Sequence, residues 1–110
     1  MTIDENKFDD LADEILNHLL DVIDEKLGDQ LEVDMENGML TIEAKTGGQY
    51  IINKHGPNRQ IWLSSPLSGA SHYDFDAASR SWVDTRSGER LNPKLADELS
   101  LLTGTSFSLD

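Results

Sequence analysis

The chain has 110 residues, no cysteine and a formal net charge of −12 at pH 7. This length allows one domain with a modest core, and the lack of cysteine excludes disulfide bonds, thiolate metal sites and thiol nucleophiles. No apolar run approaches the ~20 residues of a membrane span, and strong negative charge disfavours nucleic acid, whose phosphates would be repelled. We therefore expect a single domain over residues 1–110 that binds a basic partner or cations.

The negative charge is concentrated at the start of the chain. Residues 1–36 hold 13 Asp and Glu against two lysines, a balance of −11, whereas residues 37–110 hold eight acidic and seven basic residues, a balance of −1. The excess of carboxylates is therefore a local feature of the first third of the sequence.

Apolar residues recur at helical spacing from Phe8 to Leu27 and predict one long helix that ends near Gly28. The opposite face of this helix is acidic. Carboxylates in the first turns suit the helix dipole, whereas those in the last turns each cost roughly a few tenths of a kcal/mol. This cost indicates a functional role for the late carboxylates, while a merely solvated face explains the early ones equally well.

The next segment, residues 31–36, alternates between apolar and acidic residues and predicts a strand whose carboxylates face outward. Asn37-Gly38 is a strong hairpin signal, and a returning strand follows over residues 39–45. The first strand would lie at a sheet edge beside the end of the helix. We therefore expect the carboxylates of helix and strand to form a continuous acidic ridge.

Residues 50–66 predict a second hairpin, with its turn at Gly56-Pro57-Asn58. In its second strand Ile61 and Leu63 alternate with Trp62, so a one-sided core takes the first two and leaves the indole on the polar face. An indole offered to solvent is typical of a docking surface. The alternative is a second layer of structure that covers Trp62.

Beyond residue 66 the sequence predicts a loop over residues 67–71 and short strands over residues 72–76 and 81–83. The order of helix, meander and helix predicts an α+β fold: a two-layer α/β sandwich with an antiparallel sheet of five to six strands and both terminal helices on one face. The other sheet face would stay bare and carry Trp62.

The second helix is predicted from its end signals. Asn92 is expected as the N-cap, with Pro93 at the first helical position and Gly104 as the stop. The tail that follows contains Phe107 and Leu109, which we expect to pack back between the two helices.

The central hairpin and its surroundings are similar to the sequences of frataxin and its bacterial counterpart CyaY. The resemblance extends from about residue 8 to residue 102 and is strongest in residues 57–66, with Asn53 and Lys54, Ser68 and Gly69, Tyr73-Asp74-Phe75, Trp82 and the acidic first helix in support. It implies a sandwich with a helix at each end that acts in iron–sulfur cluster biogenesis. It also implies weak iron binding, and binding to the cysteine desulfurase and scaffold protein, whose rate such proteins modulate.

The resemblance also implies roles for individual residues. The weakly bound iron would be held by the acidic ridge, which comprises Asp10, Asp13, Asp21, Asp24, Glu25, Asp29, Glu32 and Asp34. The partner contacts of the sheet face would fall on Asn53, Gln60 and Trp62, with Lys54 and Asn58 close by and His72 beside them. His72 departs from the family pattern, because mitochondrial members carry an arginine there and a histidine can lose its charge near neutral pH. Phe75, where many members have tryptophan, is expected to be a core substitution.

From the residues alone, clustered carboxylates favour hard cations and do not select iron over calcium, magnesium or manganese. Carboxylates on one exposed ridge each donate one or two oxygens, so affinity should be modest. Glu14 and His18 are four residues apart on the helix and could coordinate a metal ion together with Asp21. A histidine on the flank of a helix is, however, more often a surface residue without a ligand.

Two functions stay open. The preferred one is an iron-binding regulator of iron–sulfur cluster assembly, and the alternative is an iron chaperone or storage protein with ferroxidase activity on oligomerisation. No G-x-S-x-G motif or phosphate-binding glycine loop supports another enzyme. We expect a monomer, with iron-driven oligomers as the alternative. The lack of a transit peptide before the first helix suits a bacterial cytoplasm, and the mitochondrial matrix is the alternative because a trimmed mitochondrial protein would look the same. The sequence leaves the direction of regulation open.

Overall fold

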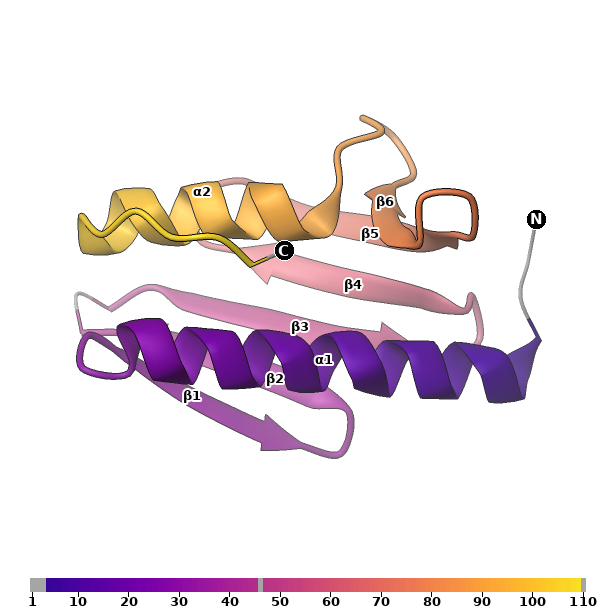
Figure 1. Cartoon of the computed structure of the whole chain (residues 1–110), viewed down its shortest axis with the longest axis horizontal. Coiled ribbons are helices and arrows are strands. Elements are labelled where there is room, and N and C mark those ends of the chain that lie inside the picture. Colours follow the sequence, from indigo (N-terminus) through magenta and orange to yellow (C-terminus); the bar gives the residue numbers. More distant parts are fainter. Residues whose placement is uncertain (1–3, 46, 110) are drawn as a thin grey trace.

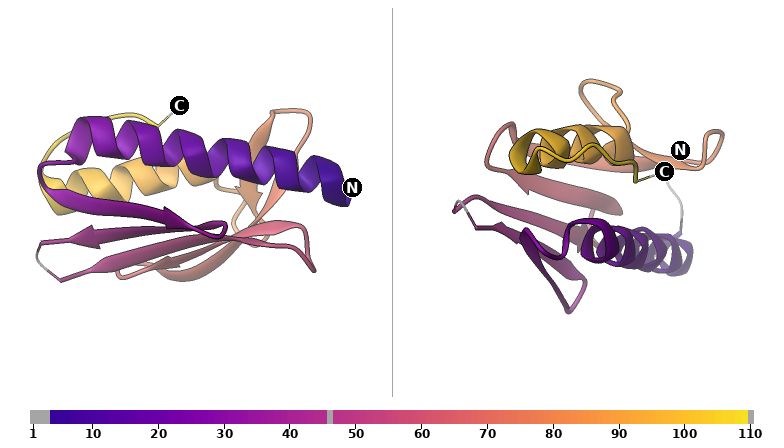
Figure 2. Two further views of the ribbon diagram at one scale, coloured as in Figure 1. Left: turned by 90° about the horizontal axis from the view of Figure 1, so that it is seen from below. Right: turned by 60° about the vertical axis from the view of Figure 1, so that its left-hand side comes forward.

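The structure is a computed structural model and describes residues 4–45 and 47–109. Two helices, α1 (Glu5–Leu27) and α2 (Leu91–Thr103), pack on the same face of a six-stranded antiparallel sheet (Figures 1 and 2). Neighbouring strands follow chain order: β1 (Leu31–Glu36), β2 (Met39–Ala44), β3 (Gln49–His55), β4 (Gln60–Ser65), β5 (Gly69–Asp76) and β6 (Ser81–Asp84). The predicted two-layer sandwich is confirmed, with the larger of the two expected strand numbers.

Helix α1 forms as its apolar periodicity predicts. The Asp4 carboxylate caps its start by accepting from the Lys7 backbone N–H at 2.8 Å, and Gly28 ends it. Neither described helix has the length and apolar composition needed to cross a bilayer. One face of α1 is buried against the sheet through Phe8, Ala12, Leu16, Leu19, Ile23 and Leu27. The acidic side chains are therefore left on the solvent side.

The β1–β2 turn fixes which side chains of the first hairpin face the helices. Asn37 and Gly38 both adopt left-handed backbone conformations, with φ of 51° and 76°, which match the twist of a two-residue hairpin. The resulting register pairs Leu31 with Ala44 and buries Leu40 and Ile42 against the helices. The alternation predicted for these two strands is confirmed.

The predicted start of α2 was wrong. Asn92 was expected as the N-cap, but the helix begins before it and Arg90 is the N-cap. An isolated bridge between Val83 and Arg90 holds Arg90 in an extended conformation, so the helix starts directly after it. Pro93 is tolerated inside the helix because N–H groups of the first turn need no intrahelical partner. The Asn92 side chain instead donates to the Leu109 carbonyl oxygen at 3.2 Å.

The loop predicted over residues 67–71 is shorter than expected. Ser64 pairs with Ala70 and Ser65 pairs with Gly69, so β5 begins at Gly69. Gly69 has a φ of +81°, which lets the chain turn tightly into the strand.

The C-terminal segment packs back as predicted. It runs alongside the helices in Figure 1, with Leu109 buried and Phe107 packed against the core. Nε2 of His18 donates to the Leu109 carbonyl oxygen at 2.5 Å. This hydrogen bond ties the tail to α1, and it occupies one of the two nitrogens that the sequence offered as a metal ligand.

A buried carboxylate anchors α2 to the sheet. Glu98 accepts hydrogen bonds from the Tyr50 hydroxyl at 3.1 Å, from Ser65 Oγ at 2.5 Å and from Ser68 Oγ at 2.8 Å. Burial, together with the charge of Glu98, raises the pKa of Tyr50 to about 12, so this hydroxyl stays protonated and able to donate. Sequence reasoning missed this network, although Glu98 interrupts the apolar stripe of α2 and so marks a buried polar contact.

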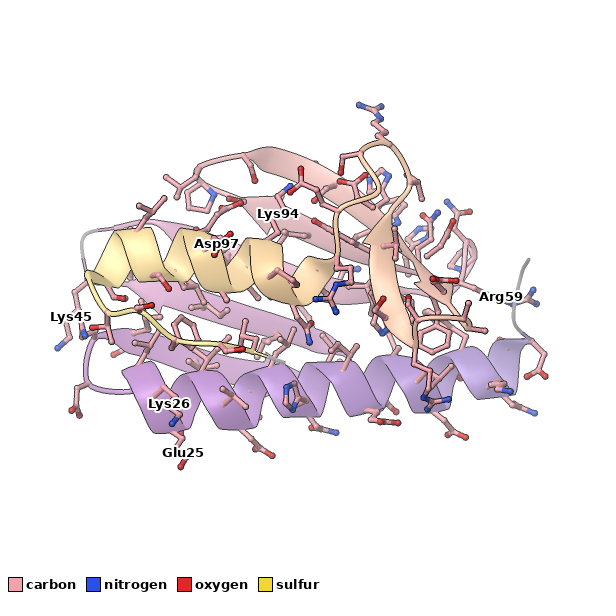
Figure 3. The ribbon with its side chains drawn as sticks, turned by 45° about the horizontal axis from the view of Figure 1, so that its top comes forward. Glu25, Lys26, Lys45, Arg59, Lys94 and Asp97 are labelled. Carbon is pink, nitrogen blue, oxygen red and sulfur yellow. The ribbon has the colours of Figure 1, made fainter. Side chains whose placement is uncertain are left out.

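Replacing Glu98 by alanine should lower the free energy of unfolding by about 2–4 kcal/mol, because the buried hydroxyls of Tyr50 and Ser65 lose their acceptor, together with the Ser68 hydroxyl. Urea unfolding measures the change. The matched control is Asp97→Ala, an exposed neighbour on the outer side of α2 (Figure 3), which should shift the free energy by less than about 0.5 kcal/mol. Equal effects of the two substitutions would show that the network does not anchor α2.

Candidate metal and partner-binding surfaces

All eight carboxylates predicted for the acidic ridge are exposed, and they occupy two sides of the sheet edge. Most of the α1 members lie on the side of the helix away from the sheet; Glu25, for example, points outward in Figure 3, whereas Asp13 lies on the flank of the helix within reach of Lys54 of β3. On β1, Leu31 is buried toward α1, so Glu32 and Asp34 point to the opposite face. Asp29 lies in the turn that joins the two groups.

The register adds a carboxylate that sequence reasoning did not include. Glu43 on β2 is the direct partner of Glu32 on β1, so two like charges stand opposite each other on the bare face. The hairpin at Asn37-Gly38 was the signal that could have located it, because the turn fixes the pairing. The acidic ridge therefore extends around the edge strand and onto the bare sheet face.

The carboxylates of the ridge do not form a compact cluster. Among residues 4–45 and 47–109, no group of three or more His, Asp or Glu side chains is arranged to hold a metal ion. Exposed carboxylates of this kind would leave most of the coordination shell to water. Iron binding by the eight named residues remains a prediction.

Lys54 contacts the ridge from the helix side of the sheet. Its Nζ lies 3.0 Å from Asp13 Oδ1 and 3.7 Å from Asp9 Oδ1. The hydrogen bond to Asp13 is the main reason that the pKa of Lys54 is raised. Lys54 was expected close to the contacts of the bare face, but it follows the same alternation as buried Ile52 and so points the other way from Asn53. It partly neutralises the N-terminal half of the ridge.

The bare face carries a stack of three aromatic rings. Trp62 lies on β4 between His55 of β3 and His72 of β5. The His55 and Trp62 ring centroids are 3.7 Å apart with planes 8° apart, and those of Trp62 and His72 are 4.3 Å apart with planes 23° apart. Trp62 is half-buried by its neighbours, and no second layer of the described residues covers it. The indole therefore presents its edge to solvent.

Hydrogen bonds hold the stack in place. The Trp62 Nε1–H donates to Gln60 Oε1 at 2.9 Å, and Gln60 Nε2 donates to Asp74 Oδ1 at 3.0 Å. The Asn58 backbone N–H lies 3.4 Å from His55 Nδ1 and donates to it. The orientation of the indole is thus set by three strands and a turn before any partner arrives.

Comparison with known proteins identifies the family. A model of the frataxin-like domain matches residues 1–105. The Iron-sulfur cluster assembly protein CyaY of Pseudomonas fluorescens is 36% identical over 112 residues, which cover 100% of this chain and 98% of that protein. The chain belongs to the frataxin/CyaY family. The mitochondrial frataxin of Arabidopsis thaliana is 38% identical over 97% of this chain, but the match covers only 59% of that longer protein.

Solved structures agree with this assignment. A frataxin from Psychromonas ingrahamii superimposes with a TM-score of 0.87 at 26% identity, covering 98% of this chain and 99% of that one. The trimeric frataxin of Saccharomyces cerevisiae complexed with ferrous superimposes with a TM-score of 0.78 at 37% identity, covering 86% and 87% of the two chains. The sandwich described above is therefore the frataxin fold.

Within this frataxin-like framework, His55 is a feature that sequence reasoning did not connect with Trp62. The two residues are seven positions apart, and they meet only because His55 pairs with Gln60 across the hairpin, two positions from Trp62. Tight turns of this kind place such diagonal neighbours within reach of aromatic side chains.

If the ring stack contributes to stability, the effects of substituting His55 and Trp62 on the free energy of unfolding should not be additive. A double-mutant cycle of His55→Ala and Trp62→Ala in urea unfolding should give a coupling of about 0.5–1.5 kcal/mol, as for other stacked rings. The cycle of Trp62→Ala with Ser79→Ala, which lies in the β5–β6 turn, should be additive within about 0.5 kcal/mol. Additivity in both cycles would mean that the rings only happen to lie parallel.

Crowding of like charges on the ridge should make stability depend on ions. Adding NaCl or a divalent cation should raise the melting temperature, because close exposed carboxylates repel by roughly several tenths of a kcal/mol per pair at low salt. The double substitution Glu32→Gln with Glu43→Gln should raise the melting temperature at low salt and reduce the response to added salt. A melting temperature insensitive to both ions and substitutions would contradict the repulsion.

Proposed function

We propose that this protein is an iron-binding regulator of iron–sulfur cluster assembly that docks on a cysteine desulfurase through its acidic ridge. The family assignment supports the pathway, since a bacterial relative that matches over 98% of its length is named an iron–sulfur cluster assembly protein. The observation that carries the docking mode is the concentration of charge: −11 of the net −12 lies in residues 1–36, the part of the chain that contains α1 and β1.

The acidic ridge is suited to a basic patch on the desulfurase. Its carboxylates are exposed on a long helix and an edge strand, which are rigid supports. A surface whose charges are all of one sign speeds the encounter with an oppositely charged partner and orients that partner. Lys54 compensates Asp13 and Asp9 and leaves the carboxylates near the end of α1 as the centre of the negative field.

The bare face is a second contact surface, directed to the scaffold protein. Asn53, Gln60, Trp62 and His72 share this face, and Asn58 lies in the adjoining turn. The ring stack fixes the indole before binding. Little further conformational entropy of the Trp62 side chain is therefore lost when a partner binds it. Lys54 does not share this face, because its side chain contacts Asp9 and Asp13 of α1.

Iron would bind weakly along the ridge through carboxylate oxygens and water. The structure of the yeast relative in complex with ferrous iron supports iron as the bound ion. The hard oxygen donors of the ridge fit Fe(II) or Fe(III) and also fit other hard cations, so competition with magnesium is expected.

Charge reversal tests the docking mode. Replacing Asp21, Asp24, Glu25, Glu32 and Asp34 by lysine should abolish binding to the desulfurase in a pull-down, while circular dichroism shows an intact fold. A smaller matched pair separates position from net charge: Asp21→Lys with Glu25→Lys should weaken binding much more than Glu89→Lys with Asp97→Lys, which changes the net charge equally outside the ridge. Unchanged binding of the five-residue variant would refute the proposal.

The rival function is iron storage with ferroxidase activity. The observation in its favour is that the yeast relative complexed with ferrous is trimeric. Under this alternative, the protein would oxidise Fe(II) faster than a buffer control and form particles that grow as iron is added. Under the preferred function, light scattering stays constant and oxidation follows the buffer rate.

A further inference from the structure

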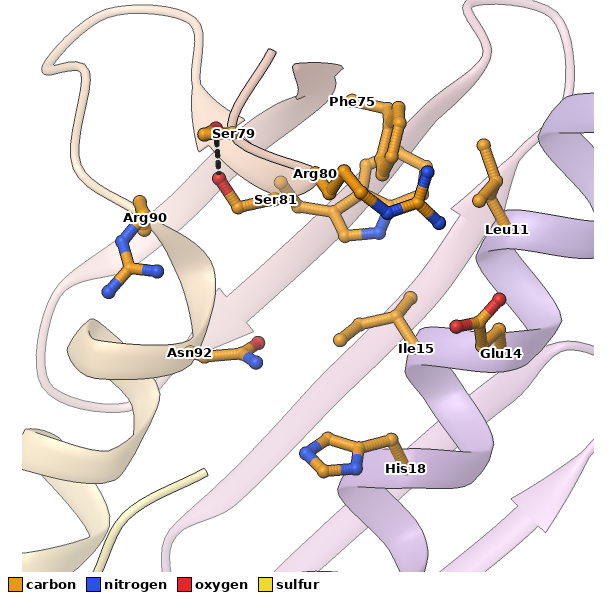
Figure 4. Close-up of a pocket in the computed structure, with 11 residues that line it drawn as sticks. Leu11, Glu14, Ile15, His18, Phe75, Ser79, Arg80, Ser81, Arg90 and Asn92 are labelled. Atoms are coloured by element: carbon orange, nitrogen blue, oxygen red, sulfur yellow. Dashed lines mark hydrogen bonds between the residues drawn. The ribbon is translucent and has the colours of Figure 1, made fainter. Parts of the chain in front are cut away.

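A cavity of about 310 Å³ opens between α1, the β5–β6 turn and the start of α2 (Figure 4). None of the eight ridge carboxylates lines it, and neither does Trp62. Its apolar wall is formed by Leu11 and Ile15 of α1 together with Phe75 and Trp82, whose rings meet edge to face with centroids 5.3 Å apart. The cavity is therefore separate from both surfaces used in the proposed function.

The charges at this cavity are opposite to those of the rest of the chain. Two of the nine basic residues, Arg80 and Arg90, line it, against the single carboxylate of Glu14. Figure 4 shows Arg80 extending from the β5–β6 turn toward α1, with Arg90 across the cavity near Asn92. No carboxylate of the described residues lies within 4.0 Å of the Arg80 guanidinium, although the chain has 21 acidic residues.

The backbone at Arg80 gives a reason to look for a role of its side chain. Its φ is +52°, in the left-handed region where glycine or asparagine is easier to accommodate than arginine. Asp76 stabilises the turn by accepting from the Ala78 N–H and from Ser79 Oγ, and the Ser79 and Ser81 hydroxyls are 2.6 Å apart at the cavity. The turn thus holds a guanidinium and two hydroxyls over an apolar wall.

We infer that this cavity binds a small organic acid with an apolar body. The body would lie against Leu11, Ile15 and the aromatic pair, and the carboxylate would be held by the Arg80 guanidinium, whose planar fork matches two carboxylate oxygens. A volume of about 310 Å³ lies at the low end of small-molecule sites and admits a ligand of about ten non-hydrogen atoms. The Arg80 guanidinium selects against amines, and the apolar wall selects against a fully hydrated anion such as phosphate.

Nuclear magnetic resonance titration of the full chain tests this inference, with 3-phenylpropionate as the probe. Binding should shift the Trp82 indole, the Ser81 amide and the Asn92 side-chain amide in one saturable event. The neutral isostere 3-phenyl-1-propanol and inorganic phosphate should each bind at least about tenfold more weakly, as expected when a charged hydrogen bond or the apolar contact is missing. Equal binding of the alcohol or of phosphate, or shifts located elsewhere, would overturn the inference.

The variant Arg80→Asn separates binding from folding. Asparagine tolerates the left-handed backbone, so the variant should fold at least as stably as the parent chain, while its affinity for 3-phenylpropionate should fall by about tenfold or more. Arg86→Asn is the matched control, since Arg86 is exposed in the loop after β6 and does not line the cavity. An unchanged affinity of Arg80→Asn, or an equal loss in Arg86→Asn, would contradict the assignment.

Discussion

Both helices bury their apolar stripes on the same face of the sheet, and this packing decides where every functional side chain lies. Because the strands follow one another as antiparallel hairpins, alternation sends Ile52 and Ile61 to the helices and Asn53 and Trp62 to the other face. A slip of one residue in any hairpin would exchange the two faces. The turn at Asn37 and Gly38 and the buried carboxylate of Glu98 hold this arrangement in register.

The position of β1 at the sheet edge explains the shape of the charged surface. Carboxylates of α1 lie above this edge, and those of β1 lie below it, with Asp29 at the turn between them. The pairing of Glu32 with Glu43 and the carboxylates in the last turns of α1 are unfavourable for folding. The ion pairs of Lys54 offset part of this cost on the helix side. A protein that tolerates such repulsion at an exposed edge is well suited to bind cations or a basic partner there.

Much of the fold could be predicted from the sequence because its signals are local. The helix from Phe8 to Leu27, the hairpins and the outward direction of Trp62 follow from periodicity and turn residues within short windows. Features that join distant segments could not be predicted in this way. The start of α2 depends on the bridge of Val83 with Arg90, and the Glu98 network joins α2 to β3, to β4 and to the turn that follows it.

The candidate site shows the same division. The positions of the ridge carboxylates on α1 and β1 follow from the sequence pattern, whereas Glu43 and the contact of His55 with Trp62 depend on register. Lys54 shows how a family resemblance can place a residue near a surface without giving its direction, since it points to the helix side of the sheet.

In the proposed function, this protein acts on the cysteine desulfurase and is not itself the catalyst. The most direct measurement is the rate of the desulfurase with its scaffold protein as the concentration of this protein is raised, with and without Fe(II). The account predicts a saturable change in rate that depends on the protein and is modified by iron. A rate that stays constant over the whole titration, with and without iron, would contradict it.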